Sequence, residues 1–84
     1  MVNVKFDDHF QRAISKIKDQ EIQKSVKNKI KKIINEPEIG KPMRNVRKGT
    51  REVYLSGGTF RLSYTYYKES DTLEFLDFYH KDEQ

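Results

Sequence analysis

Hydrophobic residues recur along the chain at two different spacings, which divide it into a helical part and a strand-forming part. At the N-terminus, Val2, Val4 and Phe6 alternate with polar residues, and this pattern predicts a short edge strand. The next apolar residues recur every three or four positions, so they predict two amphipathic helices that form a hairpin. These helical positions are Phe10, Ala13, Ile14 and Ile17, followed by Ile22, Val26, Ile30, Ile33 and Ile34.

Polar and helix-breaking residues set the ends of these helices. Asp7 and Asp8 offer side-chain oxygens that can cap the first helix. Pro37 must end the second helix, because proline cannot donate the backbone hydrogen bond that a helix interior requires. The residues that follow, 38–49, contain glycine, proline and several basic side chains, so we expect a basic loop there.

From Arg51 onward the hydrophobic period changes to two. Residues 51–55, 59–67 and 72–79 predict three strands, joined by turns at Gly57-Gly58 and at residues 68–71, and residues 80–84 form a polar end. The order is strand, helix, helix and three strands. It predicts an α+β fold in which the helical hairpin packs on one face of a small, mainly antiparallel sheet. A chain of 84 residues is expected to form one domain over residues 1–84.

The middle strand of this sheet places one arginine in an unusual position. The apolar side chains of residues 60–64 share the parity expected to face the helices, so Arg61 is expected on the open face. A long cation on a central strand is stabilised by a carboxylate or by a bound phosphate. Glu52 and Asp77 are the candidate carboxylates, and the sequence leaves the ion pair and the phosphate site equally open.

Charge is distributed unevenly along the chain, whose net charge is +4. Residues 1–51 hold 14 basic and 6 acidic residues, a net +8, whereas residues 52–84 hold 3 basic and 7 acidic residues, a net −4. Clustered basic residues attract phosphate or acidic protein segments, so nucleic acid or an acidic protein is the expected class of partner. For the lysines of the second helix, a solvated face is the alternative; these are Lys24, Lys27, Lys31 and Lys32.

The composition excludes several classes of site. The chain has no cysteine, which excludes disulfides and thiolate metal clusters, and its two histidines argue against a structural zinc site. We therefore expect neither a metal nor a cofactor. No apolar run approaches the roughly 18 residues of a membrane helix, and the N-terminus lacks a signal-peptide core. We expect no membrane partner and a cytoplasmic location.

Three segments of the chain carry a resemblance to a known family. They are the loop Gly40-Lys41-Pro42, the strand residues 60–64 (Phe-Arg-Leu-Ser-Tyr) and the ending at residues 78–81 (Phe-Tyr-His-Lys). Their order and content resemble the RelE/ParE superfamily of toxins from type II toxin-antitoxin systems. The most specific part runs from Gly57 to Tyr64, and the resemblance spans nearly the whole chain.

The resemblance to the RelE and YoeB-like branch implies a ribosome-dependent mRNA endoribonuclease that inhibits translation. In this chemistry a ribose 2′-hydroxyl attacks the adjacent phosphate without a metal, and the reaction uses a base, cations at the phosphate and an acid at the leaving oxygen. By resemblance, Arg61 would hold the phosphate charge, His80 would transfer a proton, and Lys81 would contact phosphate. Histidine suits this work because it titrates near neutrality.

The same resemblance implies partners and a nucleic-acid surface. The expected partners are a cognate antitoxin protein, the ribosome and mRNA, with a higher-order toxin-antitoxin complex as the further assembly. The basic loop is expected to bind the RNA backbone rather than the bases, and Tyr79 is a candidate stacking contact. The loop residues in question are Arg44, Arg47, Lys48 and Arg51.

The chain departs from the family pattern at several positions. Glu52 and Tyr54 stand where RelE has two strand lysines, and Met43 stands where YoeB-like toxins have a glutamate. Two alternative functions therefore stay open. One is a ParE-like inhibitor of DNA gyrase, because the same fold carries both activities, and the other is a catalytically inactive homologue that only binds its antitoxin.

Overall fold

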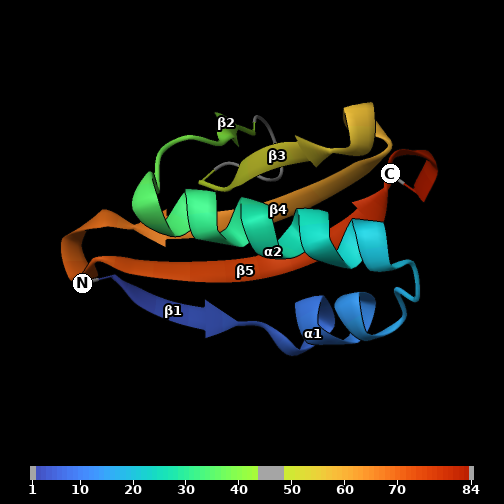
Figure 1. The fold of residues 1–84 in the computed structure, drawn as a ribbon. Coiled ribbons are helices and arrows are strands. Elements are labelled where there is room, and N and C mark those ends of the chain that lie inside the picture. Colours follow the sequence, from blue (N-terminus) through green and yellow to red (C-terminus); the bar gives the residue numbers. More distant parts are fainter. Residues whose placement is uncertain (1, 44–48, 84) are drawn as a thin grey trace.

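The computed structural model describes residues 2–43 and 49–83, and its elements follow the predicted order (Figure 1). The five strands form one sheet in the order β1-β5-β4-β3-β2, in which β1 is parallel to β5 and the other neighbours are antiparallel. Both helices cover one face of the sheet, so the predicted α+β fold is confirmed. The elements are β1 (Asn3–Phe6), α1 (Asp8–Ser15), α2 (Gln20–Asn35), β2 (Lys41–Pro42), β3 (Arg51–Leu55), β4 (Phe60–Tyr67) and β5 (Thr72–His80).

Both helices begin at an aspartate cap. The Asp7 side chain accepts a hydrogen bond from the backbone N–H of His9 at 3.0 Å, and the Asp19 side chain accepts from Glu21 at 2.8 Å. Helix α1 ends at Ser15, so Ile17 follows the helix instead of lying within it as the spacing suggested. Helix α2 ends before Pro37, as expected.

The core forms between the helices and the sheet. Phe10 from α1 and Val26 and Ile33 from α2 are buried against apolar residues of the strands. Each such side chain contributes about 1.5–3 kcal/mol when it leaves water. The buried strand residues are Leu55, Leu62, Tyr64, Leu73, Phe75 and Phe78.

The structure corrects two boundaries of the predicted strands. Lys41–Pro42, expected within the basic loop, form the short edge strand β2 that pairs with Arg51 and Glu52 of β3. His80, expected in the polar end, is the last residue of β5. The turn between β3 and β4 is centred on Gly57 as predicted, and it forms a short 3-10 turn over Ser56–Gly58.

A β-bulge interrupts the pairing of β4 with β5. Ser63 lies opposite Asp77 and Tyr64 lies opposite Phe75, so Leu76 is the extra residue on β5. A bulge of this kind shifts the alternation of side chains by one position. Relative to the residues before the bulge, the residues after it on β5 therefore face the side opposite to the one that strict alternation predicts.

This shift decides which residues of β5 lie on which face. Phe75 and Phe78 both reach the core although three positions separate them. Beyond the bulge, Tyr79 lies opposite Arg61, and His80 lies opposite Phe60. Since partners across a sheet share a face, Tyr79 joins Arg61 on the open face and His80 joins Phe60 on the helix-covered face.

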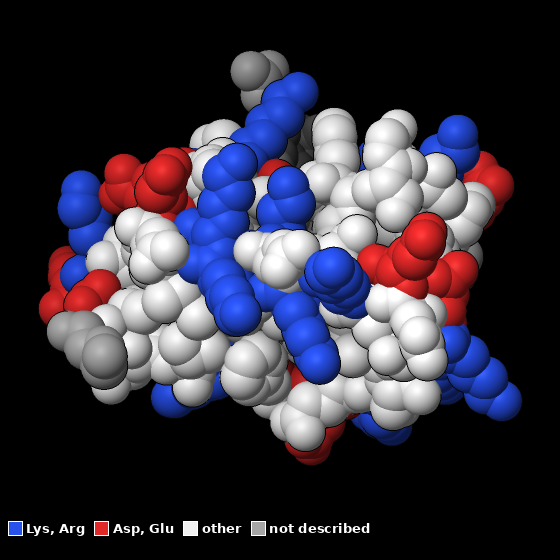
Figure 2. Space-filling view, in the orientation of Figure 1, with Lys and Arg blue, Asp and Glu red and all other residues white. Residues whose placement is uncertain are grey.

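Basic side chains gather on the solvent side of α2. Figure 2 shows Lys and Arg in the middle of the face that α2 presents, with acidic groups toward either side. The exposed lysines of this helix are those predicted to point away from its apolar stripe: Lys24, Lys27, Lys31 and Lys32.

Candidate functional site

Arg61 lies in the middle of the open sheet face, flanked by two tyrosines. It lies opposite Tyr54 of β3 on one side and opposite Tyr79 of β5 on the other. Its neighbour Leu62 is buried in the core, so Arg61 points away from the helices as predicted. The guanidinium carbon of Arg61 lies 4.7 Å from the centroid of the Tyr54 ring, within the range of a cation–π contact.

A buried carboxylate completes this group of side chains. Glu52 of β3 is only 7% exposed, and its Oε1 lies 3.9 Å from Nη1 of Arg61. The Tyr79 hydroxyl donates a hydrogen bond to Oε2 of the same carboxylate. Of the two carboxylates considered for Arg61, the structure therefore provides Glu52. We call Glu52, Tyr54, Arg61 and Tyr79 the open-face cluster.

The pairing of Arg61 with Glu52 is incomplete. Their closest atoms are 3.9 Å apart, which is an ion pair but too long for a hydrogen bond. The Arg61 Nε is buried and has no hydrogen-bond partner among the described residues. The Arg61 side chain is 24% exposed and lies too far from Glu52 for a hydrogen bond, so its guanidinium can still bind an incoming anion, and phosphate matches its planar fork.

His80 is separated from the open-face cluster. Its ring packs edge-on against Phe60 with centroids 5.3 Å apart, on the face that the helices cover. Its Nδ1 accepts a hydrogen bond from the backbone N–H of Asp82 at 3.1 Å, so a neutral ring carries its proton on Nε2. The single constellation of Arg61 and His80 that the sequence suggested is therefore not assembled in this structure.

His80 instead lines a cleft between α1 and the end of β5. The cleft has a volume of about 560 Å³, and Phe60 and Phe78 contribute apolar surface to it. Arg12 of α1 and Lys16, which caps the end of that helix, also line it. The cleft therefore combines apolar surface with basic side chains, and Asp77 and Tyr79 of β5 also line it.

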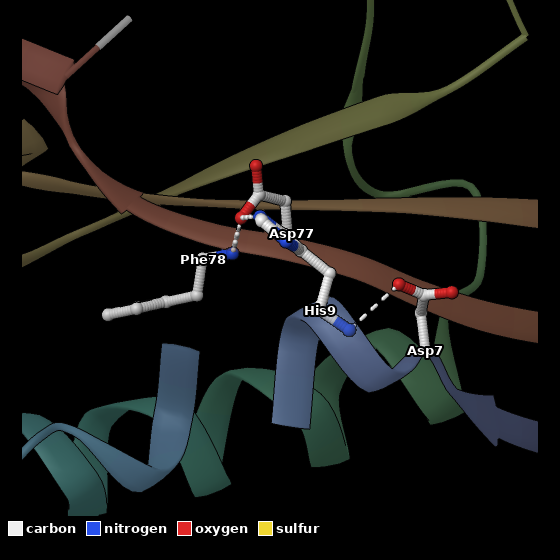
Figure 3. A network of polar contacts seen from close by, with 4 residues as sticks. All are labelled: Asp7, His9, Asp77 and Phe78. Carbon is white, nitrogen blue, oxygen red and sulfur yellow. Dashed lines mark hydrogen bonds and ion pairs between the residues drawn. The ribbon is translucent and has the colours of Figure 1, made fainter. Parts of the chain in front are cut away.

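Asp77, the other carboxylate considered for Arg61, forms its polar contacts at this cleft. Its Oδ1 lies 3.2 Å from Nε2 of His9 and accepts a hydrogen bond from the backbone N–H of Phe78 at 2.8 Å (Figure 3). The imidazole of His9 is 64% exposed. Asp77 thus links α1 to β5, and among the described residues Arg61 forms its ion pair with Glu52 instead.

The remaining predicted site residues are dispersed. Lys81 is exposed in the turn after β5, and its backbone N–H donates to the carbonyl of Thr59 at 2.9 Å. Tyr79 is 9% exposed and hydrogen-bonded to Glu52, which leaves little of its ring available for stacking on a base. The loop positions Arg44, Arg47 and Lys48 lie outside the described residues.

Arg51, expected to bind RNA backbone, holds the chain before β2 in place. Its Nη1 donates to the carbonyls of Glu38 at 2.9 Å and Gly40 at 2.7 Å. The buried Tyr64 hydroxyl accepts from the N–H of Gly40 at 2.9 Å and donates to the carbonyl of Pro37 at 2.8 Å. Burial raises the pKa of Tyr64, so the hydroxyl keeps its proton and remains a donor.

The glycine at position 40 is required by this arrangement. A Cβ there would lie 2.7 Å from the Tyr64 hydroxyl oxygen and 2.9 Å from Cβ of Arg51. The Gly40-Lys41-Pro42 loop and the tyrosine that ends the Phe60 to Tyr64 segment, two of the features that carried the family resemblance, are therefore parts of one contact. Its role is to hold β2 on the edge of β3 beside Glu52.

Sequence reasoning did not identify Glu52, Tyr54 and Tyr79 as one group around Arg61. Glu52 and Tyr54 alternate with Val53 along residues 51–55, which indicates a shared face of the strand. This alternation identifies the neighbours of Arg61 only when the register of the strands is known, because the register sets Tyr54 opposite Arg61. The pairing of the strands, rather than a local sequence motif, brings the side chains of this cluster together.

Two negative findings concern the described residues. Within residues 2–43 and 49–83, no group of three or more histidine or acidic side chains is placed to hold a metal ion. In the same part of the chain, no helix is long and apolar enough to cross a membrane.

Comparisons with known proteins find similarity in structure rather than in sequence. No protein-family model matches the chain, and no curated protein sequence matches it. A chain of the toxin-antitoxin complex RelBE2 from Mycobacterium tuberculosis matches with a TM-score of 0.79 and 27% identity, over 95% of this chain and 98% of that one.

Two Escherichia coli structures show the same fold. The isolated RelE toxin matches with a TM-score of 0.79 and 16% identity, over 95% of this chain and 84% of that one. The intact RelBE toxin-antitoxin complex contains a chain that matches with a TM-score of 0.77 and 15% identity, over 93% and 94% of the two chains. With the order of strands and helices described above, these similarities show that the chain has the fold of the RelE toxin.

Proposed function

We propose that the chain is the toxin of a type II toxin-antitoxin pair and that it inhibits translation by cutting mRNA on the ribosome. The observation that carries this proposal is the open-face cluster, where a partly exposed central-strand arginine lies 3.9 Å from its paired carboxylate, too far for a hydrogen bond. The similarity to a chain of the RelBE2 complex over nearly the full length of both chains supports the toxin assignment.

In the proposed chemistry, Arg61 binds the scissile phosphate and stabilises the charge that builds on its oxygens as the 2′-hydroxyl attacks. The cation is held in place before RNA arrives, by the Tyr54 ring and the Glu52 carboxylate, so little reorganisation is needed. Lys81, exposed beside the end of β5, is a proposed contact to a neighbouring phosphate. The backbone-binding role of Arg44, Arg47 and Lys48 remains a prediction.

Induced expression tests the proposed function. Wild-type chain should arrest growth, stop protein synthesis and leave cut messages, while plasmid supercoiling stays normal. Altered supercoiling with intact messages would instead indicate a gyrase inhibitor. Normal growth with no cut message would indicate an inactive homologue.

The separation of His80 from Arg61 yields a prediction. His80→Ala should slow message cleavage by less than about tenfold, because its ring lies on the opposite face of the sheet from the proposed phosphate site. A group that transfers a proton in the reaction contributes typically about 10²- to 10⁴-fold. Single-turnover cleavage rates of wild type and His80→Ala distinguish the two cases. A loss in the larger range would mean that His80 acts in the reaction and that RNA reaches both faces of β5.

A cognate antitoxin is the proposed protein partner, and we expect its binding segment to be acidic. Residues 1–51 carry a net charge of +8, and the lysines of α2 form an exposed basic surface (Figure 2). Affinity measured by calorimetry should therefore fall by at least about tenfold between low and high salt. An affinity that does not change with salt would contradict an electrostatic contribution.

A further inference from the structure

The environment of Glu52 sets it apart from the other carboxylates of the open sheet face. It is 7% exposed, it accepts a hydrogen bond from the Tyr79 hydroxyl, and it is the described acidic group that forms an ion pair with Arg61. Glu74 of β5 is half-exposed and accepts a hydrogen bond from the peripheral Tyr67 hydroxyl at 2.9 Å. The negative charge of Glu52 therefore repels an anion that approaches Arg61.

The distances around Arg61 indicate that Glu52 competes with other anions for the guanidinium rather than forming a close ion pair with it. A stabilising arginine–carboxylate pair is bidentate and close to 2.8 Å, whereas Glu52 and Arg61 are 3.9 Å apart. The hydrogen bond from Tyr79 holds the carboxylate from the other side. At the same time the buried Nε of Arg61 has no partner among the described residues. Glu52 thus offsets the charge of Arg61 without using its donors.

We infer that Glu52 is an internal anion that competes with RNA phosphate for Arg61 and thereby limits how tightly the toxin binds RNA. This inference rests on the proposed function, because the competing anion is an RNA phosphate. Glu52 acts through Arg61 and does not itself contact RNA, so it is a positioning residue. Its negative charge weakens phosphate binding, while its bond to Tyr79 keeps the carboxylate, and with it the arginine, in a fixed place.

Removal of this charge should strengthen RNA binding. Glu52→Gln keeps the shape of the side chain and an oxygen that can accept from Tyr79, and it removes the negative charge beside Arg61. The affinity for a short single-stranded RNA with 2′-O-methyl groups, which cannot be cut, should rise about five- to tenfold by fluorescence anisotropy. Glu74→Gln makes the same change of net charge away from Arg61 and should raise affinity by less than about twofold.

A double-mutant cycle distinguishes local competition from net charge. In an Arg61→Ala background, Glu52→Gln should give no gain in affinity, because the cation for which the two anions compete is absent. An equal gain with and without Arg61 would overturn the inference, as would no gain in the wild-type background. If Arg61→Ala alone left RNA affinity unchanged, the proposed phosphate site itself would be wrong.

A second variant tests the inference in the opposite direction, in case Glu52→Gln folds poorly. Tyr79→Phe removes the hydroxyl that donates to Glu52, so the carboxylate should engage Arg61 more strongly. RNA affinity should then fall about threefold or more. Unchanged or tighter binding by Tyr79→Phe, with a melting temperature that shows a folded protein, would contradict the inference.

Discussion

Replacing Arg61 with alanine is expected to slow cleavage of ribosome-bound mRNA by about 10²- to 10³-fold, the loss typical of one preorganised charge donor. Arg61 is fixed before RNA arrives, 4.7 Å from the centroid of the Tyr54 ring and 3.9 Å from the Glu52 carboxylate. Arg61→Lys should not restore the rate, because a single ammonium lacks the planar fork that binds two phosphate oxygens. Single-turnover rates on programmed ribosomes measure both effects.

The control for this prediction concerns stability. Arg61→Ala leaves the 7% exposed Glu52 carboxylate without its cation, and an uncompensated buried charge destabilises a fold. A double variant, Arg61→Ala with Glu52→Gln, removes that charge and should recover thermal stability relative to Arg61→Ala. It should not recover cleavage. If the stable double variant cut messages at the wild-type rate, Arg61 would have only a structural role.

The second large effect is expected at Tyr64. Tyr64→Phe should lower the free energy of unfolding by about 2 to 3 kcal/mol, because it leaves the Gly40 N–H and the Pro37 carbonyl without the hydroxyl that joins them. The hydroxyl is buried, and no apolar substitution can replace either bond. Urea denaturation gives the difference, and an unchanged slope would show that the unfolded states are comparable.

Tyr66, two residues further along β4, provides the matched control. Tyr66 donates its hydroxyl to the Asp71 carboxylate at 2.7 Å in an exposed setting, where water can take over the bond. Tyr66→Phe should therefore change stability far less than Tyr64→Phe. Equal effects of the two substitutions would mean that the Gly40 contact does not stabilise the fold.

The fold could be predicted from the sequence because its signals are local. The apolar stripes of the helices, the aspartate caps and the period-two strands each depend on neighbouring residues, and all appear in the structure. The parity of residues 60–64 also placed Arg61 on the open face correctly. The sequence offered two carboxylates, Glu52 and Asp77, as partners for Arg61 and could not choose between them. The register of the strands makes that choice, and register is a property of the whole sheet.

The position of His80 shows why the arrangement of the candidate site could not be predicted from the sequence. With Leu73 and Phe75 in the core, strict alternation along β5 would place residue 80 on the open face beside Arg61. The extra residue Leu76 shifts that alternation, so His80 lies on the helix-covered face and Tyr79 takes the place beside Arg61. A β-bulge arises from the packing of two strands, and no local motif in the sequence marks it.

We propose that this chain cuts mRNA on the ribosome through a phosphate held by Arg61. The most direct test gives purified chain to ribosomes programmed with an end-labelled message and compares it with the Arg61→Ala, Glu52→Gln double variant. We predict a cut message whose downstream fragment begins with a 5′-hydroxyl, as attack by the 2′-hydroxyl requires, and cutting by the variant that is slower by about 10²-fold or more. An intact message with the wild-type chain would overturn the proposed nuclease activity, and equal cutting by both proteins would overturn the role of Arg61.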